Sequence, residues 1–307
     1  MKTDPDLLFR FEKGLNPQDL ESSSIQARCI GYGEISAIFV IEGNDDIAYK
    51  RLPLFKNRNE AEAYRLIYHE YCELLKKAGL KLPEDETSVI EVPGRPVVLY
   101  IAQRKLPGDR LCHKLIHTLD SDSIKLMIGQ VVSETAKVWE FNRNFSPSLK
   151  LAIDGQLSNW AWIKEEENHI LYFIDTSTPL YLKEGLEKQN PELLLQSAPG
   201  FLRWMIRMFF LKDVMTRYYD PILVNTDLAG NLFKEQKPEL VPLALEIINS
   251  HIQDNEKKIT LKDIEKYYRE DKLIWTLFLS FRKIDRWITR SLLRKRYEFI
   301  LPGKIKR

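Results

Sequence analysis

The sequence has few cysteines and no long apolar run. Its three cysteines, Cys29, Cys72 and Cys112, lie far apart among 307 residues and form no C-x-x-C pair. This pattern excludes a disulfide framework and a cysteine-based zinc site, and it predicts reduced thiols. No stretch approaches the run of about 18 apolar residues that a membrane-spanning helix needs. The N-terminus is acidic and mixed, unlike a signal peptide. We therefore expect no integral membrane segment and a cytoplasmic location.

The chain also has little net charge, but that charge is unevenly distributed. There are 46 Lys and Arg against 44 Asp and Glu, for a formal charge of +2. Residues 281–307 alone contain ten Lys or Arg and two acids. A chain-wide nucleic-acid interface is therefore not expected. The 44% of hydrophobic residues is enough for a packed core.

Hydrophobic periodicity divides the chain into a strand-rich and a helix-rich part. After a polar lead over residues 1–25, alternating apolar residues predict a hairpin-rich antiparallel sheet up to about residue 105. A single helix interrupts that sheet at 60–78, where apolar residues recur at three- and four-residue spacing. Beyond a linker near Gln103 to Gly108, one strand-rich island at 150–175 lies among predicted helices at 113–118, 123–143, 191–219, 237–252 and 260–294.

Two features of the first part are suited to phosphate binding. Gly31 and Gly33 lie between two predicted strands, where glycines let a backbone turn approach phosphates closely. Taken alone, so short a glycine pattern fits a simple hairpin turn better. Lys50 follows on the next strand and shares a strand face with Ala48. It could neutralise phosphate oxygens, or it could be an exposed lysine at a sheet edge.

An acid on the predicted helix 60–78 could hold Lys50. Glu70 lies beside the apolar stripe of that helix, and it is the preferred candidate. Glu60 lies on the stripe but close to the helix start, and Glu62 points away from it. The remaining alternative is that all three acids are solvated.

The strongest pattern lies in the strand-rich island. Asp154 and Asn159 are five residues apart in a loop, and a hairpin then leads to an apolar strand that ends in Asp175. Asp154 could accept a proton from an attacking hydroxyl, and Asn159 and Asp175 offer hard oxygen ligands suited to magnesium. Ordinary turns built on Asp and Asn side chains explain each residue singly but explain the joint arrangement poorly.

This order of motifs resembles the aminoglycoside phosphotransferase-like branch of the protein-kinase-like fold. That branch has a catalytic loop H-G-D-x-x-x-x-N, a hairpin, and a strand that ends in aspartate. Asp154, Asn159 and Asp175 match these positions, and the segment Gln103 to Gly108 looks like the family's interlobe Leu-Pro-Gly. The resemblance covers roughly residues 27–180 and is loose beyond them. Here Ala152 and Ile153 replace the usual histidine and glycine.

The resemblance implies an α+β, two-lobed protein-kinase-like fold, with a small antiparallel-sheet N-lobe at 1–105 and a larger helical C-lobe at 106–307. It implies ATP and Mg²⁺ as cofactors and a small-molecule hydroxyl as phosphoryl acceptor. It also implies that Gly31, Gly33 and Lys50 bind phosphate and that Glu70 orients Lys50. The backbone around Gln103 and Lys105 would contact the adenine. Asp154 would be the general base, and Asn159 and Asp175 would be the metal ligands.

The helical part is less informative. Arg203, Arg207 and Arg217 interrupt an aromatic stretch that we interpret as a core helix, with an anionic-substrate clamp as the alternative. Near the C-terminus, arginines recur at four-residue spacing beside an apolar face. We interpret this pattern as a solvated basic face on a packed helix; the alternative is contact with an anionic membrane surface or an acidic partner. The four arginines are Arg282, Arg286, Arg290 and Arg294.

Three function classes follow from these patterns. The best supported is an ATP- and magnesium-dependent phosphotransferase that acts on the hydroxyl of a metabolite or an aminoglycoside-like compound. The second is a pseudokinase, a nucleotide-binding scaffold without transfer activity, which the loss of the loop histidine favours. The third is a non-catalytic binder of membranes or polyanions, which explains nothing before residue 280.

Overall fold

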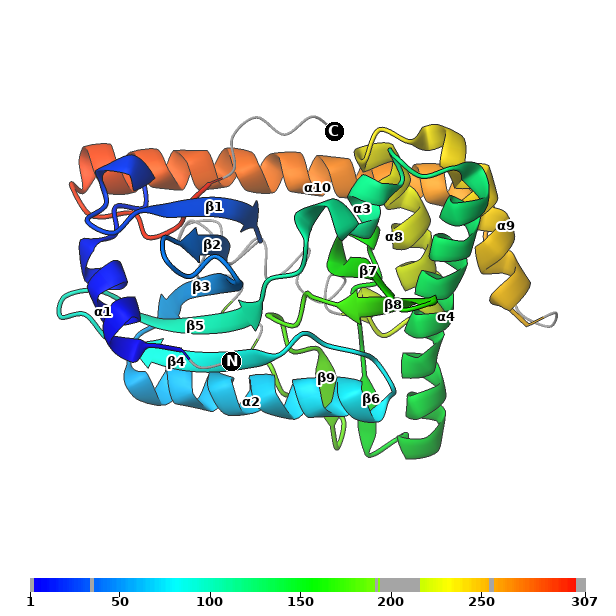
Figure 1. Ribbon diagram of the computed structural model, residues 1–307, viewed down its shortest axis with the longest axis horizontal. Coiled ribbons are helices and arrows are strands. Elements are labelled where there is room, and N and C mark those ends of the chain that lie inside the picture. The colour runs from blue at the N-terminus through cyan, green and yellow to red at the C-terminus, as the bar shows by residue number, and fades with distance from the viewer. Residues whose placement is uncertain (1–2, 34–35, 191–192, 194–215, 254–256, 302–307) are drawn as a thin grey trace.

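The computed structural model of the protein describes residues 3–33, 36–190, 193, 216–253 and 257–301. Two lobes lie side by side along the long axis of the molecule (Figure 1). The first lobe contains a small sheet, and most of the helices belong to the second. One long helix, α10 (Leu261–Trp287), runs past both lobes.

The first lobe is a five-stranded antiparallel sheet with helices packed against it. Its strands pair in the order β1-β2-β3-β5-β4. The predicted hairpins are confirmed, and β3 is the longest strand of the sheet, with nine residues. The elements are α1 (Pro5–Gly14), η1 (Leu20–Ser22), β1 (Ala27–Tyr32), β2 (Ala37–Ile41), β3 (Ile47–Phe55), α2 (Arg58–Lys77), β4 (Asp85–Ile90) and β5 (Val97–Arg104).

Helix α2 forms where the three- and four-residue periodicity predicts it. Asn57 caps its first turn by accepting a hydrogen bond from the backbone N–H of Glu60 at 2.9 Å. Gly79, with a positive φ of 92°, turns the chain away after the last turn. Its apolar face is buried against the sheet. Its C-terminal half extends beside the second lobe (Figure 1). There, Tyr71 stacks on Tyr181.

The polar lead predicted for residues 1–25 is wrong, because α1 lies within it. Asp4 caps α1, and Pro5 occupies its first turn. The helix buries Leu8 and Phe11 against the sheet in a cluster that includes Phe39. Two apolar side chains one turn apart were too weak a signal among the surrounding charges.

The second lobe combines helices with a three-stranded sheet, β10-β9-β6, and the hairpin β7-β8. Helices predicted at 113–118, 123–143, 237–252 and 260–294 are confirmed, and the one predicted at 191–219 lies mostly outside the described residues. The elements are η2 (Gly108–Arg110), α3 (Cys112–Leu115), α4 (Ser121–Phe145), β6 (Leu149–Leu151), η3 (Leu157–Asn159), β7 (Trp160–Glu165), β8 (Asn168–Phe173), β9 (Tyr181–Lys183), β10 (Leu186–Glu187), α8 (Pro221–Lys234), η6 (Pro238–Leu240), α9 (Val241–His251), α10 and the π-helical turn η7 (Ile288–Leu292).

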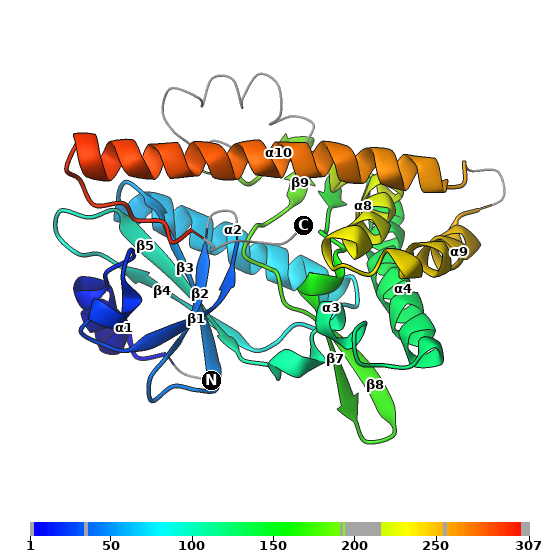
Figure 2. The same cartoon turned by 90° about the horizontal axis from the view of Figure 1, so that it is seen from above.

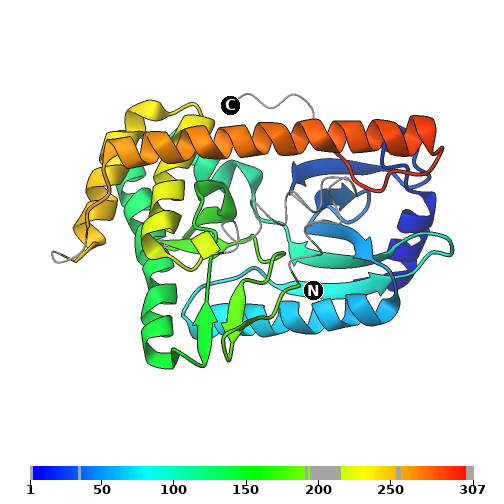
Figure 3. The ribbon, with the colours of Figure 1, turned by 180° about the vertical axis from the view of Figure 1, so that it is seen from behind.

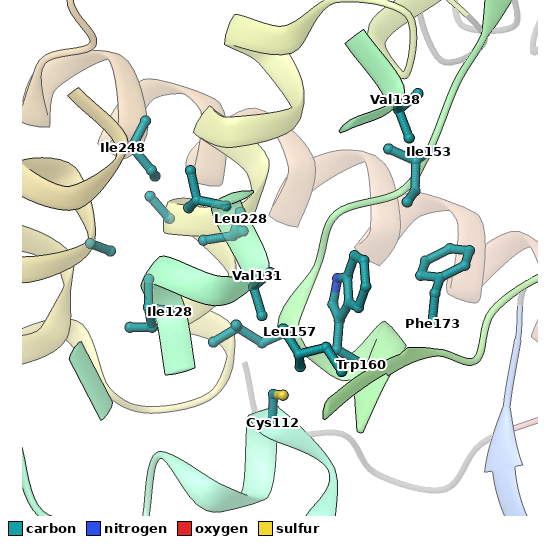
Figure 4. Packing of buried hydrophobic residues seen from close by; sticks show 14 of the residues in the cluster. Cys112, Ile128, Val131, Val138, Ile153, Leu157, Trp160, Phe173, Leu228 and Ile248 are labelled. Carbon is teal, nitrogen blue, oxygen red and sulfur yellow. The ribbon is translucent and has the colours of Figure 1, made fainter. Parts of the chain in front are cut away.

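The core of the second lobe supports the loop between β6 and β7. Ile153, Leu157 and Trp160, from that loop and the start of β7, are buried among apolar side chains of α4 and α8 (Figure 4). The apolar residues on either side of Asp154 therefore fix its backbone from both directions. With its sheet lobe, its helical lobe and this loop between them, the molecule has the two-lobed α+β architecture that the sequence predicts.

The chain returns to the first lobe after α10. Helix α10 lies along one side of both lobes when the molecule is seen from above and from behind (Figures 2 and 3). Beyond η7, Gln18 donates hydrogen bonds to the carbonyls of Tyr297 and Phe299, both at 3.2 Å. The C-terminal segment thereby fastens the far end of α10 to the sheet lobe.

The basic face predicted for α10 is partly wrong. Arg282 is buried, and its guanidinium lies 5.5 Å from the ring centre of Phe278 and 4.9 Å from that of Phe299. The apolar face expected to pack is itself open to solvent at Ile284 and Leu292. One arginine of the predicted basic face is therefore buried, and two side chains of the predicted packing face are exposed to solvent.

Among the helices that the structure describes, none combines the length and apolarity required to cross a membrane.

Candidate active site

An ion pair joins the two lobes at the predicted site. Lys50 on β3 is buried, and its Nζ lies 3.3 Å from Oδ1 of Asp175, which follows β8. The same Nζ donates a 2.6 Å hydrogen bond to the carbonyl of Ile174. The side chain of Asp175 remains 39% exposed. The lysine and the aspartate are therefore brought together although 125 residues separate them in the chain.

The loop that carries Asp154 lies beside this pair. Asn159 donates from its side-chain amide to the carbonyl of Asp154 at 3.2 Å. The carbonyl of Asn159 accepts from the N–H of Ile174 at 2.9 Å. These bonds connect the catalytic-loop candidates directly to the strand that positions Asp175. They also occupy the amide nitrogen of Asn159, so its side-chain oxygen is the atom available to a metal.

The two aspartates have opposite electrostatic environments. Burial, together with the negative charges of Asp227 and Asp175, raises the pKa of Asp154 to about 8. Burial alone would also raise the pKa of Asp175, but the Lys50 charge and hydrogen bonds from Ser177 and Lys50 outweigh it and lower that pKa. Asp154 is thus suited to holding a proton near neutral pH, and Asp175 stays ionised.

The loop is well supported although it lacks the histidine of the family pattern. Asn142 on α4 accepts from the N–H of Leu151 and donates to its carbonyl, both at 2.7 Å. Tyr71 on α2 donates to the carbonyl of Ala152 at 3.0 Å. Ala152, at the position of the family's histidine, is therefore held through its carbonyl by Tyr71 of the first lobe. The preceding residue, Leu151, is held by Asn142 of the second lobe.

Tyr71 belongs to a row of three tyrosines on the inner face of α2. Tyr64 donates to the carbonyl of Ser177 at 2.8 Å, and the hydroxyl of Tyr68 lies 3.2 Å from Oγ1 of Thr176. The spacing of four and three residues places all three on one face of the helix. This tyrosine row connects α2 to the chain on both sides of the candidate site.

The expected pairing of Lys50 with Glu70 is wrong. Glu70 accepts hydrogen bonds from Tyr181 and Lys183, both at 2.7 Å, on the second lobe. Glu60 accepts from the backbone N–H of Lys56 near the helix start. Tyrosines, not a glutamate, occupy the inner face of α2, and Lys50 therefore pairs with Asp175.

We expect Tyr71→Phe to lower the free energy of unfolding by about 1–3 kcal/mol. The hydroxyl and its acceptor, the carbonyl of Ala152, are both buried, and the variant leaves that carbonyl without this donor. Urea denaturation measures the loss. Tyr172→Phe is a matched control, because the hydroxyl of Tyr172 bonds Glu165 at the exposed tip of a hairpin. Equal losses in the two variants would contradict the inferred support.

The glycine turn and the interlobe segment are only partly as expected. Gly33 donates to the carbonyl of Ser36 at 2.9 Å and closes the hairpin β1-β2, but the tip at 34–35 lies outside the described residues. A side chain at Gly31 would come within 3.1 Å of Ile38. Phosphate contact at Gly31 and Gly33 remains a prediction.

The backbone around Gln103 and Lys105 is already engaged within the protein. Gln103 is the next-to-last residue of β5, opposite Ala48 of β3 and Asp85 of β4. The N–H of Lys105 donates to the carbonyl of Asp46 at 2.8 Å. This donor is therefore not available to an adenine ring, and adenine contact through the other backbone groups of the segment remains a prediction.

Sequence reasoning missed a buried polar group beside Asp154. Asp227 lies inside α8, where Gln156 donates to its carboxylate at 2.9 Å and Asn231 also donates at 2.9 Å. Burial is the main cause of its raised pKa. The pair Asp220-Pro221, a cap followed by proline at the first helical position, was the signal that could have located this helix.

Of the three arginines considered as a substrate clamp, Arg203 and Arg207 lie outside the described residues. Arg217 donates to the hydroxyl of Tyr267 at 2.6 Å and lies 3.7 Å from Oδ1 of Asp271. It therefore takes part in the same polar region as Asp227.

The described residues contain no group of three or more His, Cys, Asp or Glu side chains arranged to hold a metal ion. Magnesium at phosphate-transfer sites commonly takes one or two protein oxygens and completes its shell with phosphate oxygens and water. The ionised carboxylate of Asp175 and the side-chain oxygen of Asn159 provide a donor set of that kind.

A search of curated proteins finds no match to this chain. Similar solved structures include WaaP in complex with acyl carrier protein, at 11% identity and a TM-score of 0.33; that match covers 73% of this chain and 90% of that chain. Another is the GDP and kanamycin complex of APH(2")-IIia, at 10% identity and a TM-score of 0.35, covering 80% of this chain and 98% of that chain.

A family model described as "Family of unknown function (DUF6206)" matches residues 27–286, which is most of the sequence. The chain belongs to this family.

Proposed function

We propose that this protein is an ATP- and magnesium-dependent phosphotransferase that moves a phosphoryl group to the hydroxyl of a small molecule, either a metabolite or an aminoglycoside-like compound. The observation that carries the proposal is the contact of Lys50 with Asp175 at the junction of the lobes, beside the loop of Asp154 and Asn159. Residues 1–105 would bind the nucleotide and residues 106–307 the acceptor. A cytoplasmic location, where ATP is abundant, agrees with this role.

Each residue has a role that its geometry permits. Lys50 would neutralise phosphate oxygens, and Asp154 would orient the acceptor hydroxyl and take its proton. Asn159 and Asp175 would hold magnesium, which supplies positive charge that stabilises the transferring phosphoryl group. Most of the rate enhancement would then come from positioning and charge neutralisation.

The alternative is a pseudokinase. The observation that favours it is the absence of a carboxylate from α2 beside Lys50, whose contacts instead are Asp175 and the carbonyl of Ile174. Under this alternative the protein binds nucleotide but transfers nothing. Turnover measurements separate the two functions.

We expect the thermal shift that ATP and magnesium produce to be lost in Asp175→Ala and Asp175→Asn. Both changes remove the ionised carboxylate, and the Asn variant keeps the shape of the side chain next to Lys50. Melting temperatures with and without ATP, at matched magnesium concentrations, give the measurement.

The control for this experiment is Asp45→Ala, in the exposed turn between β2 and β3. It removes one acid of the first lobe without touching the site, so its shift should equal that of the wild type. A full magnesium-dependent shift in both Asp175 variants would refute the metal-ligand assignment.

A further inference from the structure

The outer face of α10 carries an unusual row of exposed apolar side chains. The helix has 27 residues and is therefore about 40 Å long. The exposed residues of the row and of the turn that follows are Leu273 at 61%, Leu277 at 40%, Ile284 at 45%, Trp287 at 63%, Leu292 at 69% and Leu293 at 54%. Leu273, Leu277, Ile284 and Trp287 are four, seven and three residues apart, with Ser280 between the second and third. They therefore form one stripe along the helix, which we call the α10 stripe.

The rest of the helix explains why the α10 stripe is outside the core. The opposite face of the N-terminal half packs on α8, where Tyr268 stacks on Phe233 with ring centres 5.0 Å apart. Ile264 of the same half is fully buried. Packing thus fixes how the helix is rotated about its axis, and the stripe is left on the solvent side.

Positive charge accompanies the stripe. Residues 272–296 contain eight Lys or Arg and a single acid, Asp285. Two of these cations make contacts within the protein. Arg282 is buried against aromatic rings, and Arg296 donates a hydrogen bond to Glu298 at 2.7 Å. At about 100° per residue, Lys283 lies along one flank of the stripe, and Arg290 follows in the π-helical turn η7; both are exposed.

We propose that the α10 stripe is a docking surface for an anionic lipid bilayer. Exposed Leu, Ile and Trp side chains with flanking cations on one helix face match an amphipathic helix that lies in the membrane interface. Tryptophan is favoured there because its ring is amphipathic. This inference is independent of the phosphotransferase proposal.

The test is sedimentation of the full-length protein with vesicles of phosphatidylcholine, with and without phosphatidylglycerol. We expect binding to the anionic vesicles that weakens with salt, and little binding to the neutral ones. The double variant Ile284→Ser, Trp287→Ser should bind roughly tenfold or more weakly, because it removes two apolar anchors. The double variant Lys283→Gln, Arg290→Gln should bind roughly 30-fold more weakly at low salt. Each lost charge contributes about 1 kcal/mol near an anionic surface, and about 1.4 kcal/mol corresponds to a tenfold change in affinity.

The matched control is Leu66→Ser with Leu126→Ser, which removes two exposed apolar side chains from α2 and α4. Its binding should equal that of the wild type, and circular dichroism should be unchanged in all variants because the altered side chains are exposed. The proposal is overturned if anionic vesicles are not bound, or if the control loses binding as well. It is also overturned if the wild type is a dimer that the Ile284, Trp287 variant cannot form, since the stripe is then a protein interface.

Discussion

Replacing Asp154 by asparagine should lower turnover by about 100- to 10,000-fold, the usual contribution of a positioned general base. This corresponds to about 3–5 kcal/mol of transition-state stabilisation. Asparagine keeps the size of the side chain but cannot take a proton from the acceptor. Nucleotide affinity should hardly change, because the base contacts the acceptor and not the phosphates. The assay is ATP consumption with a panel of hydroxylated metabolites and aminoglycosides.

The same variant should be more thermostable than the wild type at neutral pH. The pKa of Asp154 rises from an ordinary 3.8 to about 8 in the folded protein. The folded state therefore binds this proton more tightly than the unfolded state does, and its stabilising contribution is lost as the pH rises from about 4 to about 8. Asparagine has no proton to lose, so the melting temperature of Asp154→Asn should fall less over this range.

The raised pKa also predicts the pH dependence of the wild type. A general base must be unprotonated, so kcat/KM should rise with pH until it passes about 8. Asp120→Asn is a suitable control, since Asp120 is an exposed cap of α4 and asparagine caps a helix equally well. Full turnover in Asp154→Asn would show that Asp154 is not the base. Tight nucleotide binding by a wild type that transfers to no acceptor would favour the pseudokinase.

Local sequence patterns predicted most of the first lobe and the loop of Asp154. Strand β3 follows directly from apolar residues that recur at two-residue spacing, and helix α2 from apolar residues that recur at three- and four-residue spacing. The five-residue spacing of Asp154 and Asn159 survives in the structure as a hydrogen bond between them. In each case the signal and the structure lie within one short segment.

The errors concern contacts between distant segments. The face of α2 was predicted correctly, but the partner of Glu70 is Lys183 on β9, a strand of three residues with no clear pattern of its own. Helix α8 was missed because Asn, Thr and Asp at its centre resemble a turn. In the structure, hydrogen bonds from Gln156 and Asn231 satisfy the buried carboxylate of Asp227. Tertiary contacts outweighed local propensity at both places.

Arg51→Met should lower the free energy of unfolding by about 3–5 kcal/mol, because it leaves a buried carboxylate without its cation. Arg51 and Glu12 are both almost fully buried. Nε and Nη2 of Arg51 bond the two carboxylate oxygens of Glu12, each at 2.7 Å, in a bidentate pair. Tyr100 donates a third hydrogen bond to Glu12 at 2.5 Å.

The pair also fixes the C-terminal segment that follows α10. Arg51 donates to the carbonyl of Glu298 at 2.7 Å and to its carboxylate at 2.8 Å. Burial alone would raise the pKa of Glu12, but the charge and hydrogen bonds of Arg51 lower it. Because the folded pKa is lowered, this contribution is present at neutral pH and is lost as the pH falls through the folded pKa. The arginine therefore links α1, β3 and the chain end in one charged cluster.

The measurement is urea denaturation of Arg51→Met beside Arg58→Met, which breaks the exposed pairs of Arg58 with Glu62 and Glu91. The control should lose only about 0–1 kcal/mol, since exposed ion pairs contribute little. Adding Glu12→Leu to Arg51→Met should restore part of the stability, because the stranded charge is then removed and an apolar side chain takes its place. If Arg51→Met costs no more than Arg58→Met, the buried cluster does not hold the chain end to the sheet lobe. If the double variant is less stable than Arg51→Met alone, the unpaired charge of Glu12 is not the source of the loss.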